Sequence, residues 1–288
     1  MSCYVYCSLT IVSPRSFFFY TPLLVGVVTG TVSYSSIIES MRWYCGSKVK
    51  NPFIQGECQG VDFKNKLVSC NATSGDELKI DYDYLVFALG AETADFGIPG
   101  VKEYSAPIKE VEHSIALHRL ILDKLEHASA LLSAQALALE SRTGALSTRD
   151  AEIDKQLHWV VVGGGPSGVE LVAELNDFVN EDVQKAFPAL AKRIRISLIE
   201  ATSRILPSFD AKIAEYAKDT LEKQGAKVMC NTMVTRINSD SSVEIKQCAD
   251  KTGNLLDIAL NKTLDSGVAV WAGGIAPRGI TKQIGASL

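Results

Sequence analysis

The fold is decided by the stretch Val160-Val161-Val162-Gly163-Gly164-Gly165-Pro166-Ser167-Gly168-Val169-Glu170. It begins as an apolar strand, turns through glycines spaced G-x-G-x-x-G, and continues in a helical pattern. The first glycine of such a turn permits the tight bend, the second lets the backbone approach a diphosphate, and the third lets helix and strand pack closely. The free N–H groups and the positive end of the helix then favour phosphate. The motif lies between a strand and a helix, which is the context that a dinucleotide-binding loop requires. We therefore predict a dinucleotide cradle formed by Gly163, Gly164, Gly165, Pro166, Ser167 and Gly168.

The next strand, expected at 194–200, ends in the acidic residue Glu200. A carboxylate there accepts hydrogen bonds from a ribose 2′-hydroxyl and repels a 2′-phosphate, which favours NAD(H) over NADP(H). The spacing is longer than the usual distance of roughly 20 residues, and the polar stretch 176–192 accounts for the excess as a longer helix and connector. Arg204 lies close enough to oppose this preference, and a solvated charge at a strand end is the alternative interpretation of Glu200.

Composition places the chain among ordinary globular proteins. Its 288 residues are 47% hydrophobic and 22% charged, enough for about two domains. The net charge of −4 comes without a basic block, so the chain lacks the electrostatic signature of a nucleic-acid-binding protein. Seven cysteines, at 3, 7, 45, 58, 70, 230 and 248, form no C-x-x-C, and with four histidines they offer no zinc-type spacing. We therefore expect reduced cysteines and no metal site.

Strand and helix signals alternate along the chain, which predicts an α/β fold with a parallel sheet. We expect helices at about 109–142, from Ser167 onward, and at about 210–224. Strands are expected at 5–12, 84–90, 157–162, 194–200, 226–229, 243–247 and 267–272, with two short strands joined by a polar turn at 64–66. The polar stretch 143–156 is interpreted as a loop or linker.

An uncharged stretch of 23 residues lies between Arg15 and Glu39, long enough to span a bilayer. It contains Pro22, Gly26 and Gly30, several Ser and Thr, and no flanking basic cluster. We therefore expect a buried core segment rather than a transmembrane helix.

Two further strand ends resemble each other. The apolar runs 85–90 and 268–274 both finish in small residues, at Gly90 and at Ala272-Gly273-Gly274. Small residues at such ends let the backbone approach a planar ligand. Two nucleotide-binding units, the second inserted in the first, would give this arrangement.

These residues carry a resemblance to a family. The resemblance is carried by the stretches 11–24, 96–101, 162–175 and 177–182. The chain resembles the type II (alternative, non-proton-pumping) NADH dehydrogenases, which are flavoproteins with two dinucleotide domains. The resemblance covers essentially all of the chain. It implies FAD and NADH as cofactors, hydride transfer from NADH to FAD, and electron transfer to a quinone.

The same resemblance implies residue roles. Ser13, Pro14, Arg15, Thr21, Pro22 and Leu23 would face the flavin, and Gly90 would lie near FAD. Glu170 would lie near the nicotinamide–flavin contact as the catalytic candidate, although a carboxylate simply favoured by the helix dipole is an equal alternative. Disulfide reductases of this fold are disfavoured because no closely spaced cysteine pair lies on a suitable segment.

The resemblance also implies a domain plan. We expect a partial FAD-binding domain at 1–107, an NAD(H)-binding domain at 108–275 with a polar linker at about 143–156, and the start of the return to the FAD domain at 276–288. The family opens with a strand and a glycine-rich loop for the FAD diphosphate, and continues well past Gly274. We therefore expect a chain truncated at both ends that does not hold FAD firmly by itself.

The partners implied are a quinone acceptor, a membrane surface contacted peripherally through segments outside this chain, and a second copy of the chain in a homodimer. Localisation at the mitochondrial inner membrane follows from the same resemblance. Two alternatives stay open: a related flavoprotein reductase with a protein acceptor, and a non-catalytic NADH-binding fragment.

Overall fold

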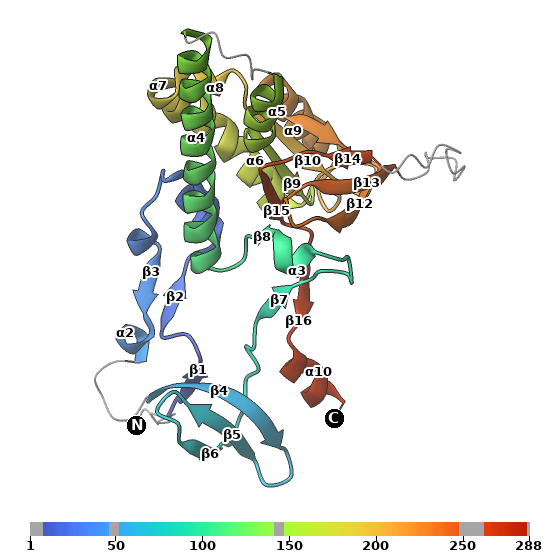
Figure 1. The fold of residues 1–288 in the computed structure, drawn as a ribbon. Coiled ribbons are helices and arrows are strands. Elements are labelled where there is room, and N and C mark those ends of the chain that lie inside the picture. The colour runs from blue at the N-terminus through green and yellow to red at the C-terminus, as the bar shows by residue number, and fades with distance from the viewer. Residues whose placement is uncertain (1–7, 46–51, 141–146, 248–261, 287–288) are drawn as a thin grey trace. The chain divides into compact units, whose positions relative to one another are not determined.

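The computed structural model describes residues 8–45, 52–140, 147–247 and 262–286 (Figure 1). The chain divides into two units. Unit 1 consists of 1–20, 35–92 and 275–288, and unit 2 consists of 21–34 and 93–274. The predicted α/β class is confirmed. The assignment of FAD- and NAD-binding domains to particular residues stays a prediction.

A parallel sheet forms the centre of unit 2. Its strands, in spatial order, are β11 (Lys227–Met229), β10 (Arg195–Ile199), β9 (His158–Val162), β15 (Val268–Trp271) and β8 (Ala106–Pro107). Every residue of β9 and β15 is buried, as expected for apolar strands covered on both faces. The strands expected at 157–162, 194–200, 226–229 and 267–272 are confirmed.

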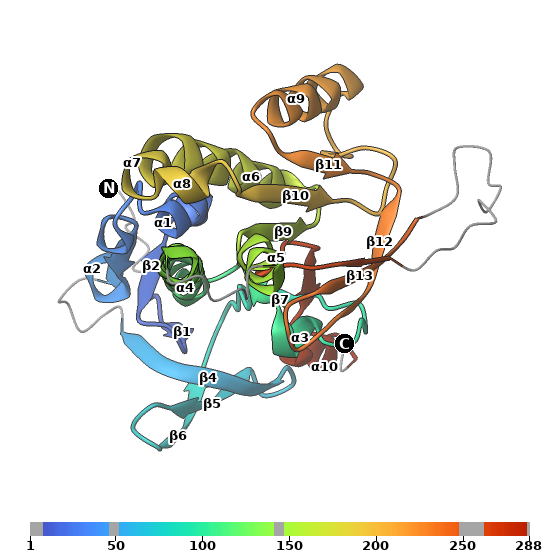
Figure 2. The same ribbon diagram turned by 45° about the horizontal axis from the view of Figure 1, so that its top comes forward.

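Helices cover one face of this sheet. Trp159 and Val161 of β9 belong to a core cluster shared with α4 (Val111–Glu140), α6 (Pro166–Phe178) and α9 (Ala211–Lys223). Figure 2 shows α6 beside β10 and α9 beside β11. All three helices were expected from sequence periodicity. Shorter helical segments complete this unit: α1 (Leu24–Thr29) after the turn η1 (Thr21–Leu23), α3 (Val101–Tyr104), η3 (Val179–Val183), α7 (Gln184–Ala186) and α8 (Pro188–Ala191).

An antiparallel sheet covers the other face. Val160 and Val162 of β9 alternate with the residues that face the helices, and pack with β12 (Thr232–Ile237), β13 (Val243–Gln247) and β14 (Lys262–Leu264). Because successive strand residues point to opposite faces, β9 packs against the helices on one face and against the antiparallel sheet on the other. Only β13 of these three strands was expected from the sequence.

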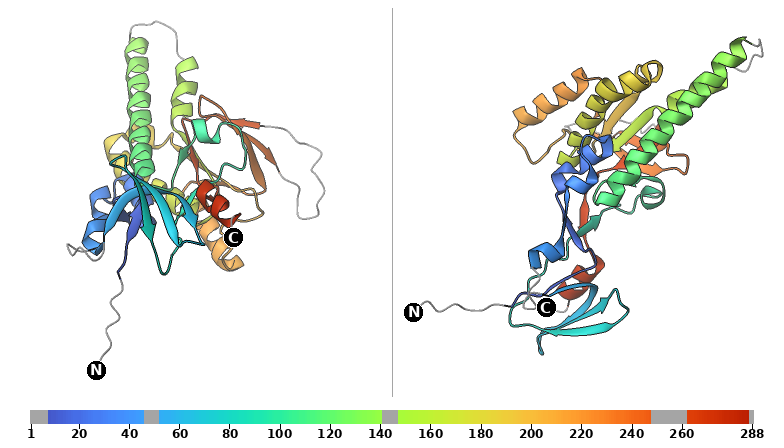
Figure 3. Two further views of the ribbon diagram at one scale, coloured as in Figure 1. Left: turned by 90° about the horizontal axis from the view of Figure 1, so that it is seen from below. Right: turned by 90° about the vertical axis from the view of Figure 1, so that its left-hand side faces the viewer.

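The segment expected as a polar loop at 143–156 is a correction. Residues 147–156 form helix α5 (Ser147–Gln156), whereas 141–146 lie outside the described residues. The helix is polar overall, but it places Ile153 in the core and uses Asp150 and Asp154 to bind Arg193, at 3.2 and 2.7 Å. Ile153 is the one buried apolar side chain described in this helix, and a single apolar residue in a charged stretch is too weak a periodic signal to predict a helix. Figure 3 shows α5 beside the long helix α4.

Unit 1 is built on a second sheet, in the order β1 (Ile11–Ser13), β4 (Phe53–Asp62), β5 (Leu67–Ala72) and β6 (Glu77–Asp81). The turn expected at 64–66 joins β4 to β5, where the Asn65 N–H donates to Asp62 Oδ1 at 2.9 Å. Figure 3 shows β4, β5 and β6 side by side. The remaining elements are β2 (Phe17–Phe19), η2 (Tyr34–Ser36), β3 (Ile38–Ser40), α2 (Met41–Cys45), β7 (Ala91–Thr93), β16 (Ile275–Pro277) and α10 (Gly279–Gly285).

The strand expected at 84–90 is wrong. These residues have no regular structure, and Tyr84 and Val86 are 93% and 85% exposed. An apolar run becomes a buried strand only when neighbouring strands pair with it, and none does so in the described part of the chain. Of the strand expected at 5–12, β1 realises only the end, and residues 1–7 lie outside the described ones.

The uncharged stretch after Arg15 is folded into both units rather than forming one helix. Its central part, α1, is buried throughout and ends at Gly30, which takes a left-handed conformation. His118 of α4 donates from Nδ1 to the Val28 carbonyl at 2.8 Å and so satisfies the end of α1. The expected burial is confirmed for α1, whereas Phe18, Tyr20 and Tyr34 of the same stretch are about half exposed. Among the described helices, none has the length and apolarity needed to cross a bilayer.

Candidate functional site

The strand order of unit 2 creates a topological switch point between β9 and β15. The chain leaves β9 toward β10 on one side, and β15 pairs with β9 on the other. In open parallel sheets, ligands bind beyond the carboxyl ends of the strands at such a point. Gly163 and Ala272 follow these two strands directly, and the Ala272 N–H donates to the Val162 carbonyl at 2.7 Å. The predicted glycine turn after β9 and the predicted small residues after β15 therefore lie side by side at the carboxyl edge of the sheet.

Two of the motif glycines are required by the protein itself. Gly163 has φ of +113°, and a Cβ there would collide with the Ala272 carbonyl oxygen. A Cβ on Gly168 would collide with the Gly163 carbonyl oxygen. The first glycine thus permits the turn and the third permits close packing of α6 on β9, as the motif predicts.

Gly165 is different. It precedes α6 with φ of −73°, which any residue adopts, and no atom lies within 4 Å of the position that a Cβ would take. Neither the backbone nor the packing of the described residues demands glycine here. The space in front of this helix start is open, and Pro166 and Ser167 beside it are exposed. This is the geometry that a closely approaching diphosphate would use.

Glu200 is fixed by the backbone of the cradle. Its two carboxylate oxygens accept from the N–H groups of Gly164 and Thr202, each at 2.7 Å. The Gly164 carbonyl in turn accepts from the Leu206 N–H at 2.7 Å. The acidic residue predicted from the strand end therefore lies against the predicted loop despite the long spacing. Its partner Thr202 was missed, because no sequence pattern marks it.

Arg204, which could oppose a preference for NAD(H), is engaged elsewhere. Its Nη2 donates to the carbonyls of Pro207 and Phe209 at 2.9 and 3.2 Å. These bonds hold the guanidinium on its own loop.

The end of β15 is tied to the segment 93–96. Trp271, 3% exposed, donates from Nε1 to the Ala94 carbonyl at 2.7 Å, and the Ala94 N–H donates to the Gly274 carbonyl at 3.0 Å. A Cβ on Gly273 would lie 2.7 Å from the Trp271 ring, so the small residue is required there. Sequence reasoning found the small residues but not the indole that needs them.

Glu170 lies on α6, one turn beyond the cradle, and its side chain is exposed. Partial burial of the carboxyl raises its pKa. One helical turn further, Glu174 accepts a hydrogen bond from the Thr29 hydroxyl at 3.3 Å. Glu170 is therefore the accessible carboxylate of this helix face.

The residues expected to face a flavin occur in both units. In unit 1, the Arg15 guanidinium lies over the Phe19 ring at 4.4 Å, Ser13 Oγ accepts from the Arg15 N–H, and Pro14 accepts from Gln55 at 3.2 Å. Gly90, also in unit 1, has φ of +70°. In unit 2, Thr21, Pro22 and Leu23 form the exposed turn η1 before the buried α1. The residues of the predicted dinucleotide cradle lie together within unit 2, and the binding roles of all these residues stay predictions.

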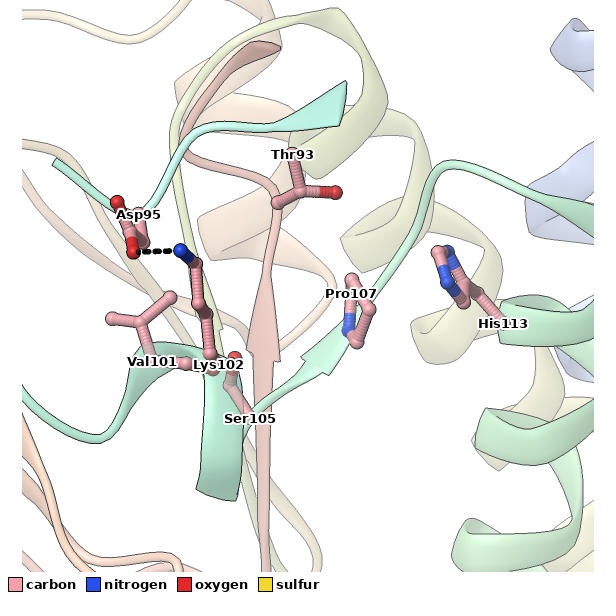
Figure 4. Close-up of a pocket in the computed structure, with 7 residues that line it drawn as sticks. All are labelled: Thr93, Asp95, Val101, Lys102, Ser105, Pro107 and His113. Carbon is pink, nitrogen blue, oxygen red and sulfur yellow. Dashed lines mark hydrogen bonds and ion pairs between the residues drawn. The ribbon is translucent and has the colours of Figure 1, made fainter. Parts of the chain in front are cut away.

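A small cavity lies elsewhere in unit 2 (Figure 4). It encloses about 180 Å³ and is lined by Thr93, Asp95, Val101, Lys102, Ser105, Pro107 and His113. Lys102 Nζ pairs with Asp95 at 2.9 Å, and burial lowers the pKa of His113. None of the predicted site residues lines this cavity.

A parallel sheet with a glycine-rich turn at its switch point is the architecture of dinucleotide-binding α/β proteins. A model of the pyridine nucleotide-disulphide oxidoreductase family matches residues 8–287, and the chain belongs to that family.

Several curated proteins are similar to this chain. The mitochondrial external alternative NAD(P)H-ubiquinone oxidoreductase B2 of Arabidopsis thaliana is 36% identical over 279 residues, which cover 95% of this chain and 44% of that protein. A probable mitochondrial NADH-ubiquinone oxidoreductase of Schizosaccharomyces pombe is 33% identical, covering 95% of this chain and 47% of that protein. The chain thus spans about half the length of the curated relatives it matches.

Solved structures agree with this family. NDH2 from Plasmodium falciparum, solved in complex with NADH, superimposes with a TM-score of 0.82 at 30% identity, covering 97% of this chain and 52% of that chain. The resemblance to type II NADH dehydrogenases expected from the sequence is confirmed.

Proposed function

We propose that this chain forms the NADH-binding part, and a portion of the FAD-binding part, of an enzyme that passes electrons from NADH through FAD to a quinone without pumping protons. The observation that carries the proposal is the open position at Gly165, which packing and backbone leave unexplained at the start of α6. The relatives' names supply the acceptor class, ubiquinone, and the mitochondrial location.

The cradle would hold NADH through its backbone. The N–H groups at the start of α6 would bind the diphosphate, whose charge the helix dipole favours. Glu200 is held by Gly164 and Thr202, so its remaining acceptor capacity would meet a ribose hydroxyl in a fixed position. The same carboxylate would repel a 2′-phosphate, which favours NADH over NADPH.

The residues proposed for FAD fit an apolar ring. Pro22 and Leu23 are exposed, Leu23 by 39%, although they directly precede a buried helix. Such apolar surface is covered favourably by a planar ligand. When bound, FAD would supply acceptance of a hydride and onward transfer of electrons to a quinone.

Glu170 is proposed for the nicotinamide end of the site. Its raised pKa comes from desolvation, so a neutral carboxyl is more populated there than on an open helix surface. Peripheral attachment to the mitochondrial inner membrane and a homodimer are part of the same proposal and rest on the resemblance.

The test is an absorbance spectrum of the purified chain, recorded before and after addition of NADH. A flavin band that bleaches with NADH, followed by reoxidation with a soluble quinone, is the expected result for the full proposal. If the chain binds NADH but carries no flavin, the alternative of a non-catalytic NADH-binding fragment would replace the full proposal. If the chain reduces a protein acceptor but no quinone, the alternative of a flavoprotein reductase with a protein acceptor would replace it.

A further inference from the structure

Two cysteines that are 12 residues apart in the sequence lie opposite each other in unit 1. In the antiparallel pair of β4 and β5, Cys58 is registered directly against Cys70, and both are free thiols. Directly opposed residues share one face of a sheet, with Cβ atoms about 4.5–5.5 Å apart. A disulfide needs Cα atoms within about 4.4–6.8 Å and Cβ atoms within about 3.5–4.5 Å, so a small local shift suffices.

The backbone beside the pair offers that shift. The register slips between Cys58 and Gly60, so Gln59 is an extra residue in a β-bulge. A bulge interrupts the regular ladder, bends the strand and increases its local twist, so the ideal ladder spacing is not enforced at this point. The Cys58 thiol lies 3.9 Å from the Gly60 carbonyl, across this bulge.

The two thiols differ in access. Cys70 is fully buried, whereas Cys58 is partly exposed. Burial raises the pKa of both thiols. Because Cys58 is the more exposed of the two, an outside oxidant would reach it first, and Cys70 would resolve the product.

We propose that Cys58 and Cys70 form a reversible disulfide across β4 and β5 when the protein meets hydrogen peroxide. The Cys58 thiolate attacks one peroxide oxygen and becomes a sulfenic acid, while the other oxygen leaves with the thiol's proton as water. The Cys70 thiolate then attacks the Cys58 sulfur, forming the S–S bond and releasing a second water. The two sulfurs lose two electrons, which reduce the peroxide. This site is independent of the nucleotide cradle and of the proposed activity.

Trypsin makes the test direct. Cleavage after Lys50, Lys64, Lys66 and Lys79 places Cys58 in the peptide 51–64 and Cys70 in the peptide 67–79, each as its single cysteine. The full chain is exposed to hydrogen peroxide, unfolded with iodoacetamide to block remaining thiols, digested without reductant and analysed by mass spectrometry. The expected product is the two peptides joined with loss of two hydrogens, and dithiothreitol separates them.

Two variants and one condition control the result. Cys58→Ser abolishes the linked peptide, whereas Cys230→Ser, in unit 2, leaves its yield unchanged. Peroxide treatment of the wild-type chain in urea lowers the yield, because the strands no longer oppose the thiols; this comparison holds even if Cys58→Ser does not fold. Recovery of both peptides separately, alkylated or over-oxidised, would overturn the proposal, and so would an equal yield from the unfolded chain.

Discussion

The backbone N–H of Gly164 donates to the Glu200 carboxylate at 2.7 Å, so the acidic residue of one strand end holds the glycine loop of its neighbour. Glu200→Ala removes this bond and the one from Thr202. We expect NADH binding to weaken about tenfold to a hundredfold, since a hydrogen bond to a charged group contributes about 1.5–3 kcal/mol and about 1.4 kcal/mol is a factor of ten. NADPH binding should weaken less, because the repelling charge is gone.

Titration calorimetry with both nucleotides measures this. Glu215→Ala, an exposed change on α9, is the matched control and should bind like the wild type. Equal NADH affinity in Glu200→Ala and the control would contradict the role of Glu200.

Substitution of two cradle glycines should change the free energy of unfolding by different amounts. Gly168→Ala forces a Cβ onto the Gly163 carbonyl, so we expect a loss of about 1–3 kcal/mol in the free energy of unfolding, as for other overpacked sites. Gly165→Ala meets no protein atom and should cost less than about 1 kcal/mol, the range for a changed helix cap. Urea unfolding compares them. A larger loss in Gly165→Ala would show that the space in front of α6 is not open.

Trp271 should stabilise unit 2 through its indole nitrogen. Trp271→Phe removes the bond to the Ala94 carbonyl, whereas Trp159→Phe removes an equally buried indole whose nitrogen has no hydrogen-bond partner among the described residues. Both changes shorten the side chain equally, so the extra cost at Trp271 isolates the hydrogen bond, about 1 kcal/mol. Unfolding both variants in urea measures the difference, and equal costs would refute it.

His158 should make stability depend on pH. It is buried with Nδ1 donating to the Asp265 carbonyl and Nε2 accepting from Ser197, and burial lowers its pKa from 6.5. The unfolded chain therefore takes up a proton at a higher pH than the folded chain. The free energy of unfolding should fall as pH drops below about 6.5, with a slope of at most about 1.4 kcal/mol per pH unit until the folded-state pKa is passed.

Unfolding at several pH values tests this in two variants. His158→Asn should lose that part of the pH dependence, whereas His127→Asn, exposed on α4, should keep it. An unchanged slope in His158→Asn would assign the pH dependence to other groups.

The sequence predicted the elements whose signal is local. The strand β9, the turn at Gly163 and helix α6 follow from adjacent residues, and the structure has them where expected. The helix α5 was missed because Ile153 is the one buried apolar residue described in it, among charged and polar neighbours. The run 84–90 was misread because apolar residues form a strand only beside partner strands, which local sequence does not report.

Contacts between residues on different strands or far apart in the sequence could not be predicted from the sequence either. Cys58 pairs with Cys70 because of the register between β4 and β5, and this register includes a β-bulge that no sequence pattern predicts. The bond from Trp271 to Ala94 joins residues 177 apart. The site glycines could be named from their motif, but the contacts that make two of them obligatory and leave Gly165 open required the folded chain.

The central claim is that the space in front of Gly165 holds the diphosphate of NADH. It is tested most directly by titrating NADH into the wild-type chain, Gly165→Val and Gly279→Val. Gly279 is the matched control, since it opens helix α10 and a Cβ on it would also have no atom within 4 Å. The account predicts that Gly165→Val loses NADH binding while remaining folded, and that Gly279→Val binds like the wild type. Undiminished NADH affinity in Gly165→Val would contradict it.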